Sequence, residues 1–295
     1  MKKKILSAFN VKNKLAFNAL LFVGFFAVNF SLNAQTVTTI GQVLGNPSGI
    51  AVDAAGFVYI AERAPTTTIT KLNQSTGLTS IFSSTGFNDP MDIAFGPNSE
   101  LFVADVVSNS ILKIPFTGGT ATSYVTGADK PTGLAFDSDT LYYIEYTTQK
   151  IFKVLPGGGA VGSLNVIQIS DSALWMSPGA RGVSLTLLAD GNLFVTAGLH
   201  YSQYIVNKTT GSIITEIYNE SEGTIFGAEE LSDGAIYMPG NSTNKIYKWS
   251  SNVTDSSPWF GNGTSDSVDG SDTIASFDSP YFMASDASDN LYVTD

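Results

Sequence analysis

Short apolar runs alternate with turn residues along almost the whole chain after residue 35. A Pro or Gly turn leads into a strand of small apolar residues. An acidic or Gly-containing turn and a strand centred on an aromatic residue follow, as in Pro47–Asp53 with Phe57–Glu62 and Pro131–Asp137 with Leu141–Glu145. This phrase recurs six times, at a spacing of roughly 40–50 residues that is typical of repeat architectures.

Each copy continues into further apolar runs of strand length. Ser110–Ile114 and Lys245–Trp249 are examples of a third run, and Ile213–Ile217 is an example of a fourth. The chain after residue 34 contains no window with a sustained helical period and caps. Four antiparallel strands per unit, repeated around an axis, predict an all-β fold, a six-bladed β-propeller of four-stranded antiparallel blades.

Residue size supports this arrangement. The first strands carry small residues where neighbouring blades would crowd the axis: Gly49, Ala51, Ala94, Gly133 and Ala135. The second strands carry aromatic residues where the gap between blades widens: Tyr59, Phe102, Tyr142, Phe194, Tyr237 and Tyr292. Aromatic rings fill such gaps well, so we interpret these six residues as core and not as a ligand platform.

The two ends of the repeat array should meet. We expect Thr36–Ile40 to form the outer strand of the last blade and so to close the ring. The sequence ends at Asp295, after the second strand of the last copy. We therefore expect the last blade to be incomplete in this chain, and the polypeptide to be the front portion of a longer one, truncated at its C-terminus.

The first 34 residues have the pattern of a secretory signal peptide. Lysines in residues 2–14 precede an apolar stretch at 19–30, and Leu32–Ala34 resembles a cleavage site before Gln35. The apolar stretch is too short for a bilayer core of about 30 Å. We expect residues 1–34 to be removed near Ala34, leaving a domain of residues 35–295 that is secreted, periplasmic or at the cell surface, without a membrane span.

Charge and cysteine content narrow the function. Five of the 15 Lys and Arg and none of the 26 Asp and Glu lie in residues 1–34, so removing them changes the formal net charge from −11 to −16. Such a surface repels nucleic acid, which we exclude as a partner. The chain has no cysteine, which excludes disulfides, thiol redox chemistry and cysteine-ligated zinc.

A family resemblance follows from these motifs. The segment 260–295, with Phe260-Gly-Asn-Gly, Asp269-Gly270 and Pro280-Tyr-Phe-Met-Ala-Ser-Asp286, resembles an NHL repeat, and the likeness extends over residues 36–295. It implies a six-bladed propeller of the gluconolactonase-like (SMP-30) superfamily. The predicted signal peptide, and the stretch of this segment that is rich in Gly, Asp and Phe, are similar to those of secreted Bacteroidetes proteins. Because this fold hosts binding scaffolds, lactonases and lyases, the resemblance does not decide the function.

Two groups of residues are candidates for chemistry. Asp92, Glu229 and Glu230 break the small-residue rule of the first strands, and carboxylates meeting at the axis would hold a divalent cation such as calcium. His200 is the single histidine and a candidate general base. Arg181, Glu145 and His200 are the candidate ligand-binding residues.

Two functions remain open from the sequence. The first is a secreted binding or scaffold module that holds a carbohydrate, peptide or protein ligand at the mouth of the central channel. The second is an enzyme, either a calcium-dependent lactonase like the gluconolactonases or a lyase like virginiamycin B lyase. We favour the binding module, because the sequence contains no nucleophile motif beside the single histidine.

Overall fold

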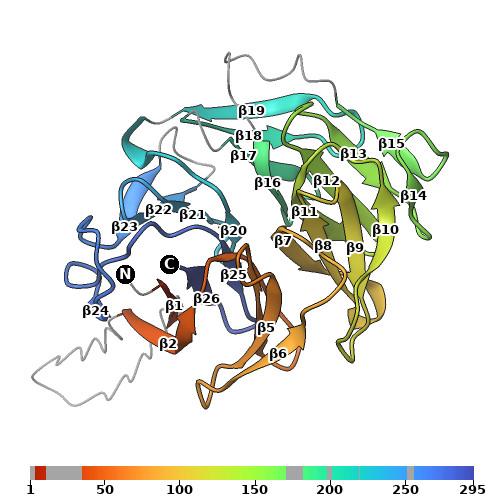
Figure 1. The fold of residues 1–295 in the computed structure, drawn as a ribbon. Helices are drawn as coiled ribbons and strands as arrows, with labels where there is room; N and C mark the ends of the chain where they lie inside the picture. The colour runs from red at the N-terminus through yellow and green to blue at the C-terminus, as the bar shows by residue number, and fades with distance from the viewer. Residues whose placement is uncertain (1–3, 11–34, 171–181, 198–200, 219, 251–255) are drawn as a thin grey trace, which may run out of the picture.

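The computed structural model describes residues 4–10, 35–170, 182–197, 201–218, 220–250 and 256–295. Apart from two short 3₁₀ turns, Pro97–Ser99 and Glu220–Glu222, the regular structure of these residues is β-strand. The strands form six sheets. Figure 1 shows them arranged about a common centre, as expected for a propeller.

Five of the sheets are regular blades, each built from strands that follow one another along the chain. The first two contain β3 (Pro47–Val52), β4 (Phe57–Glu62), β5 (Thr68–Asn73) and β6 (Thr79–Ser83), then β7 (Pro90–Phe95), β8 (Leu101–Asp105), β9 (Ser110–Ile114) and β10 (Thr122–Thr126). The third contains β11 (Pro131–Asp137), β12 (Thr140–Glu145), β13 (Ile151–Val154) and β15 (Val166–Gln168), and a short strand, β14 (Gly159–Ala160), joins β10 in parallel.

The fourth and fifth blades repeat the arrangement. They contain β16 (Gly182–Leu187), β17 (Leu193–Ala197), β18 (Ser202–Val206) and β19 (Ile213–Tyr218), then β20 (Glu229–Glu230), β21 (Ile236–Gly240), β22 (Lys245–Trp249) and β23 (Ser257–Phe260). Neighbouring strands within each blade are antiparallel. The expected all-β propeller of four-stranded antiparallel blades is confirmed in these five sheets.

The remaining sheet, which we call the composite sheet, is built differently. Its strand order is β24 (Gly270–Ser271), β2 (Thr36–Leu44), β1 (Lys4–Asn10), β26 (Asn290–Thr294) and β25 (Met283–Ser285). The expectation of a six-bladed propeller is therefore corrected: the structure has five regular blades, each from a single chain segment, and one composite sheet that joins the two ends of the chain. The outer strand predicted at Thr36–Ile40 is confirmed as part of β2.

The expectation that the last blade is incomplete is also corrected. The third-strand position, beside β26, is held by β1, which pairs antiparallel with both β26 and β2. This strand lies within the predicted signal peptide. Removal of residues 1–34 stays a prediction, and it would take β1 out of the sheet.

Neighbouring innermost strands approach too closely for side chains at certain positions. A Cβ atom added to Gly49 would lie 2.5 Å from the Cα of Asp92, and one added to Gly133 would lie 2.6 Å from the Cα of Ser184. The aromatic residues of the second strands are at most 3% exposed: Tyr59, Phe102, Tyr142, Phe194, Tyr237 and Tyr292. The predicted wedge packing, narrow at the axis and wider outside, is confirmed.

Replacing Gly49 by alanine should destabilise the protein, because the added methyl group meets backbone atoms of β7 and not a flexible side chain. We expect the free energy of unfolding to fall by about 1–3 kcal/mol, the usual cost of overpacking. Denaturant unfolding checks this, with Ala54→Val as a control that adds volume at an exposed turn. A Gly49→Ala protein as stable as the control would contradict the packing.

Candidate functional site

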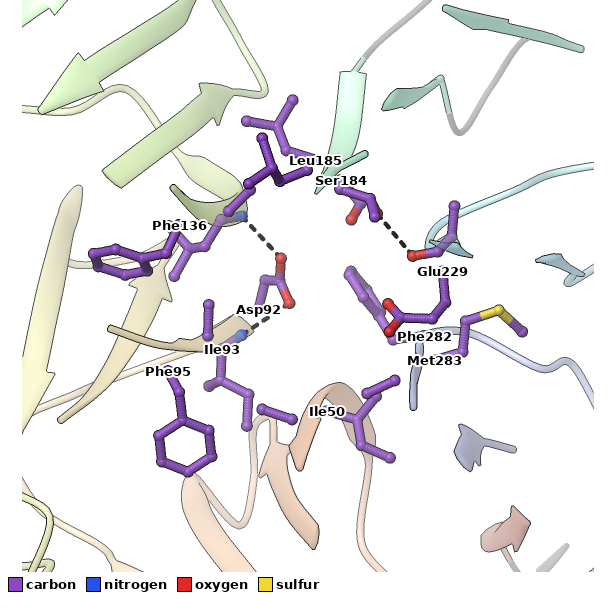
Figure 2. A pocket seen from close by; sticks show the side chains of 18 of the residues that line it. Ile50, Asp92, Ile93, Phe95, Phe136, Ser184, Leu185, Glu229, Phe282 and Met283 are labelled. Carbon is purple, nitrogen blue, oxygen red and sulfur yellow. Dashed lines mark hydrogen bonds between the residues drawn. The ribbon is translucent and has the colours of Figure 1, made fainter. Parts of the chain in front are cut away.

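A cavity of about 340 Å³ lies on the axis of the propeller. It is lined by the innermost strands β3, β7, β11, β16, β20 and β25, so every sheet contributes to its wall (Figure 2). Most of the lining residues are apolar, and Asp92, Ser184, Thr186, Glu229 and Ser285 add polar groups to the wall. A cavity that combines apolar residues with a few polar groups is the usual setting of a small-molecule site.

Apolar side chains cover one end of the axis. Met91, Val183 and Phe282 belong to one buried cluster, against which Phe226 and Tyr281 pack. The rings of Phe226 and Tyr281 have centroids 4.3 Å apart, and the hydroxyl of Tyr281 lies 3.9 Å from the sulfur of Met91. These residues lie at or just before the starts of the innermost strands, so we infer that the cavity opens toward the ends of those strands.

Asp92 is a buried carboxylate in this apolar wall. Its Oδ1 accepts a hydrogen bond from the backbone N–H of Ile93 at 2.8 Å, and its Oδ2 accepts one from the N–H of Leu134 on the next blade at 2.9 Å (Figure 2). Burial raises the pKa of Asp92 to about 7, although these two N–H groups favour the charged form. Asp92 therefore joins two innermost strands and also places a titrating group at the axis.

Glu229 is the second carboxyl group of the cavity and comes from β20 (Figure 2). Its Oε1 accepts hydrogen bonds from the N–H and the hydroxyl of Ser285, at 3.2 and 2.6 Å. Burial raises the pKa of Glu229 to about 7, and these bonds oppose the rise. Asp92 and Glu229 thus give the cavity two carboxyl groups that change charge near neutral pH.

Glu230 faces away from this pair, because neighbouring residues of a strand point to opposite sides. Its Oε2 accepts a hydrogen bond from the N–H of Ala189 at 2.6 Å, and it lines an adjoining pocket with Asp137 and Lys208, to which Glu229 also contributes. Within the described part of the chain, no group of three or more His, Cys, Asp or Glu side chains is placed to hold a metal ion. The structure thus brings Asp92 and Glu229 to one cavity but does not add Glu230 to them, and a calcium site stays a prediction.

Glu145, a predicted ligand-binding residue, is buried at the end of β12 and lines none of these cavities. Its Oε1 accepts a hydrogen bond from the N–H of Asp129 at 2.9 Å, and its Oε2 contacts the hydroxyl of Thr148. Burial raises its pKa, and these bonds act in the opposite direction. Glu145 therefore holds the loop that leads into its own blade, and its role in ligand binding stays a prediction.

The same use of an acid recurs in other blades. Acidic residues at the end of the second strand accept N–H groups from the segment that precedes the blade: Glu62 from Gly45, Asp105 from Asn88 and Asp89, and Asp295 from Asp278. Sequence reasoning noted acids at repeat turns but missed this role. The signal was their fixed place after the aromatic strand in several copies of the repeat.

The other two predicted site residues, His200 and Arg181, lie outside the described residues. Their suggested roles as general base and ligand-binding groups stay predictions.

A second, smaller cavity of about 200 Å³ lies where the first blade meets the fifth blade and the composite sheet. Arg63 and Tyr281 are among its lining residues, together with Asn46 and Asn241. The guanidinium of Arg63 makes two hydrogen bonds to the carboxylate of Asp89, at 2.8 and 2.5 Å. Because this ion pair satisfies much of the charge of Arg63, the axial cavity is the stronger candidate site.

Comparison with known proteins supports the fold. No family model and no curated protein matches the chain. Solved structures do match, and virginiamycin B lyase from Staphylococcus aureus has 17% sequence identity and a TM-score of 0.61, over 84% of this chain and 77% of that one. An auxiliary nutrient binding protein from Bacteroides ovatus has 13% identity and a TM-score of 0.66, over 85% of this chain and 69% of that one. A protein of unknown function from Bacteroides thetaiotaomicron has 13% identity and a TM-score of 0.68, over 98% of this chain and 90% of that one.

At these identities the likeness shows the β-propeller fold and nothing finer. Among the residues described, no helix is both long enough and apolar enough to span a membrane.

The acidic residues at the ends of the second strands should stabilise the folded protein, and Asp105 is the test case. Asp105 is fully buried, and besides Asn88 and Asp89 it accepts the N–H groups of Val107 and Ser108. Asp105→Ala leaves these groups without their acceptor, so we expect the free energy of unfolding to fall by about 2–4 kcal/mol. Denaturant unfolding checks this against Asp139→Ala at an exposed turn. Equal stability of the two variants would refute the role of Asp105.

Glu229 should make stability depend on pH. Its folded pKa of about 7 lies above the ordinary value of 4.5, so the folded state binds more protons than the unfolded state between these values. Stability should therefore fall as the pH rises from about 4.5 to about 7, by up to about 3 kcal/mol from this group. We expect Glu229→Gln to remove that part of the decline in denaturant unfolding at pH 4.5, 6 and 7.5. Parallel pH profiles of wild type and variant would contradict it.

Proposed function

We propose that this protein is a ligand-binding module of the NHL-repeat propeller type that holds a small carbohydrate in the axial cavity. The observation that carries the proposal is the pair Asp92 and Glu229, two carboxyl groups in a cavity whose wall is otherwise mostly apolar. Taking carboxyl groups out of water costs stability, so two of them in one cavity mark a candidate functional site. Hydroxyl groups of a sugar are suitable partners, because they donate to a carboxylate and accept from its protonated form.

The dimensions of the cavity favour a small ligand over a protein. A volume of about 340 Å³ lies at the lower end of the range, about 300–1,000 Å³, found for small-molecule sites. Apolar residues of the innermost strands, such as Ile50 and Leu185, also line the cavity. Apolar surface suits the carbon-bound hydrogens of a sugar ring, while the two carboxyl groups fix its orientation. A peptide or protein ligand would be limited to the outer rim.

We further propose that the composite sheet acts as a sixth blade and closes the ring. The hydroxyl of Thr294 donates a hydrogen bond to the carbonyl of Ser48 on the first blade at 2.9 Å. The bonds from Ser285 to Glu229 join the same sheet to the fifth blade. Both neighbours of the composite sheet are thus held by polar contacts close to the axis.

The export pattern of residues 1–34 supports a function outside the cytoplasm, in the periplasm or at the cell surface. Two of the matching structures are auxiliary nutrient binding proteins, from Bacteroides ovatus and Bacteroides thetaiotaomicron, which supports a binding role, while others are a lyase and a sugar dehydrogenase. Capture of a nutrient sugar would agree with both points.

Titration calorimetry with a panel of mono- and disaccharides tests the proposal. We expect at least one sugar to bind, and Glu229→Gln to weaken it about tenfold, equivalent to about 1.4 kcal/mol. The matched control is Glu230→Gln, the next residue in the strand, which should change the affinity less than about twofold because its carboxylate is bonded to Ala189 outside the axial cavity.

Two results would overturn the carbohydrate assignment. One is the failure of every sugar in the panel to bind. The other is a rise in melting temperature with calcium that is lost in Glu229→Ala, which would favour the metal-dependent hydrolase instead.

A further inference from the structure

A pocket of about 440 Å³, which we call the side pocket, adjoins the axial cavity and is formed by the third, fourth and fifth blades. The two spaces share Thr186, Leu187 and Glu229 as lining residues. Asp137 and Lys208 line the side pocket but not the axial cavity. Because the two linings overlap, one ligand can extend from the axial cavity into the side pocket.

An ion pair between two blades lies in the lining of the side pocket. Asp137 is the last residue of β11, and Lys208 lies in the loop that follows β18. The Nζ of Lys208 is 2.5 Å from the Oδ2 of Asp137, and the two side chains are 27% and 36% exposed. Their hydrogen bond lowers the pKa of Asp137 and raises that of Lys208. Both groups are therefore charged at neutral pH and accessible to a ligand.

Aspartates at the outlet of the innermost strands have a different partner in other blades. In the first and fifth blades the aspartate pairs with a lysine on the third strand of its own blade: Asp53 with Lys71, and Asp233 with Lys248. The third blade also carries a lysine on its third strand, Lys153, but Asp137 pairs with Lys208 of the next blade. This aspartate is thus used at a junction of two blades, where the side pocket lies.

The fourth blade supplies its lysine from a loop and not from its third strand. Ile205 stands opposite Phe194, at the place where the third and fifth blades carry the lysine. Lys208 lies instead in the loop 207–212, close to Gly191, where an added Cβ would be 3.4 Å from the lysine Nζ. Its ammonium therefore reaches the end of β11, on the side toward which the axial cavity opens.

The chemistry of this pair suits a hydroxyl group. An ammonium only donates hydrogen bonds and a carboxylate only accepts them, whereas a hydroxyl does both. Three carboxyl groups and one amine line the pocket: Asp137, Glu229, Glu230 and Lys208. This balance disfavours an anionic ligand. The Oε2 of Glu230 already accepts the N–H of Ala189, so the contacts to a ligand fall to Asp137 and Lys208.

We infer that the side pocket is a second sugar subsite, and that the ligand is a neutral saccharide of at least two units. One unit occupies the axial cavity beside Asp92 and Glu229, and the next binds Asp137 and Lys208. This inference rests on the proposed function, because the axial cavity must hold the first unit. A second unit joined covalently to the first adds its contacts without a second loss of translational freedom, and so raises the affinity.

Titration calorimetry on the full chain tests the second subsite. The probes are glucose and galactose, and the disaccharides maltose, cellobiose and lactose that are built from them. Lys208→Met removes the ammonium and keeps an apolar side chain of similar length. Loss of a partly exposed ion pair has little effect on stability, so this variant should fold. Ala189→Phe places a ring in the side pocket from an exposed position.

The matched control is Lys113→Met. Lys113 forms an ion pair with Glu100 at 3.0 Å, with side chains that are 33% and 25% exposed, and neither residue lines the axial cavity or the side pocket. The control thus removes a lysine from a comparable ion pair away from the proposed subsites.

We expect at least one disaccharide to bind about tenfold more tightly than its component monosaccharides. Lys208→Met should weaken that disaccharide about fivefold, as for one lost hydrogen bond, and leave the monosaccharide affinity unchanged. Ala189→Phe should reduce the disaccharide affinity to that of the monosaccharide. Glu229→Gln should weaken both sugars alike, and Lys113→Met should weaken neither.

The second subsite is wrong, with the proposed function still standing, if glucose or galactose binds as tightly as every disaccharide. It is equally wrong if Lys208→Met and Ala189→Phe bind the disaccharide as tightly as the wild type does. Binding of none of the five sugars would contradict the proposed function and the second subsite together.

Discussion

Close approach of the innermost strands is the constraint on which the rest of this structure depends. At Gly49 and Gly133 the backbone of the next sheet lies within 2.6 Å of the place where a Cβ would be. Sheets that meet so closely at the axis must diverge outward, because strands twist and side chains need room. The diverging space is filled by the buried aromatic residues of the second strands, such as Phe102 and Tyr237.

The axial cavity is a consequence of the same geometry. Innermost strands arranged around a centre leave a small space between them, and apolar side chains cover one end of it. Asp92 and Glu229 enter this space as carboxyl groups whose pKa values burial raises to about 7. A packing requirement alone would favour small apolar residues at both positions, so these two acids are the clearest mark of function in the described part of the chain.

Acidic residues serve two unlike purposes in this fold, and their chemical type does not separate them. Glu145 and Asp105 sit at the ends of second strands, where loop N–H groups occupy their oxygens. Glu229 sits in an innermost strand, where the side chain faces the axis (Figure 2). The distinction is one of position: an acid at a strand end satisfies backbone donors, whereas an acid on the axis faces a cavity.

The sequence by itself determined the strand content, the repeat and the core. Alternating apolar residues and turn signals are local, so runs such as Ser110–Ile114 were predicted with the bounds that the structure has. The tertiary structure decided that Glu230 turns away from Glu229, that Glu145 holds a loop, and that β1 enters the composite sheet. These outcomes depend on which segments meet in space, and contacts between distant segments leave no periodic pattern in a single sequence.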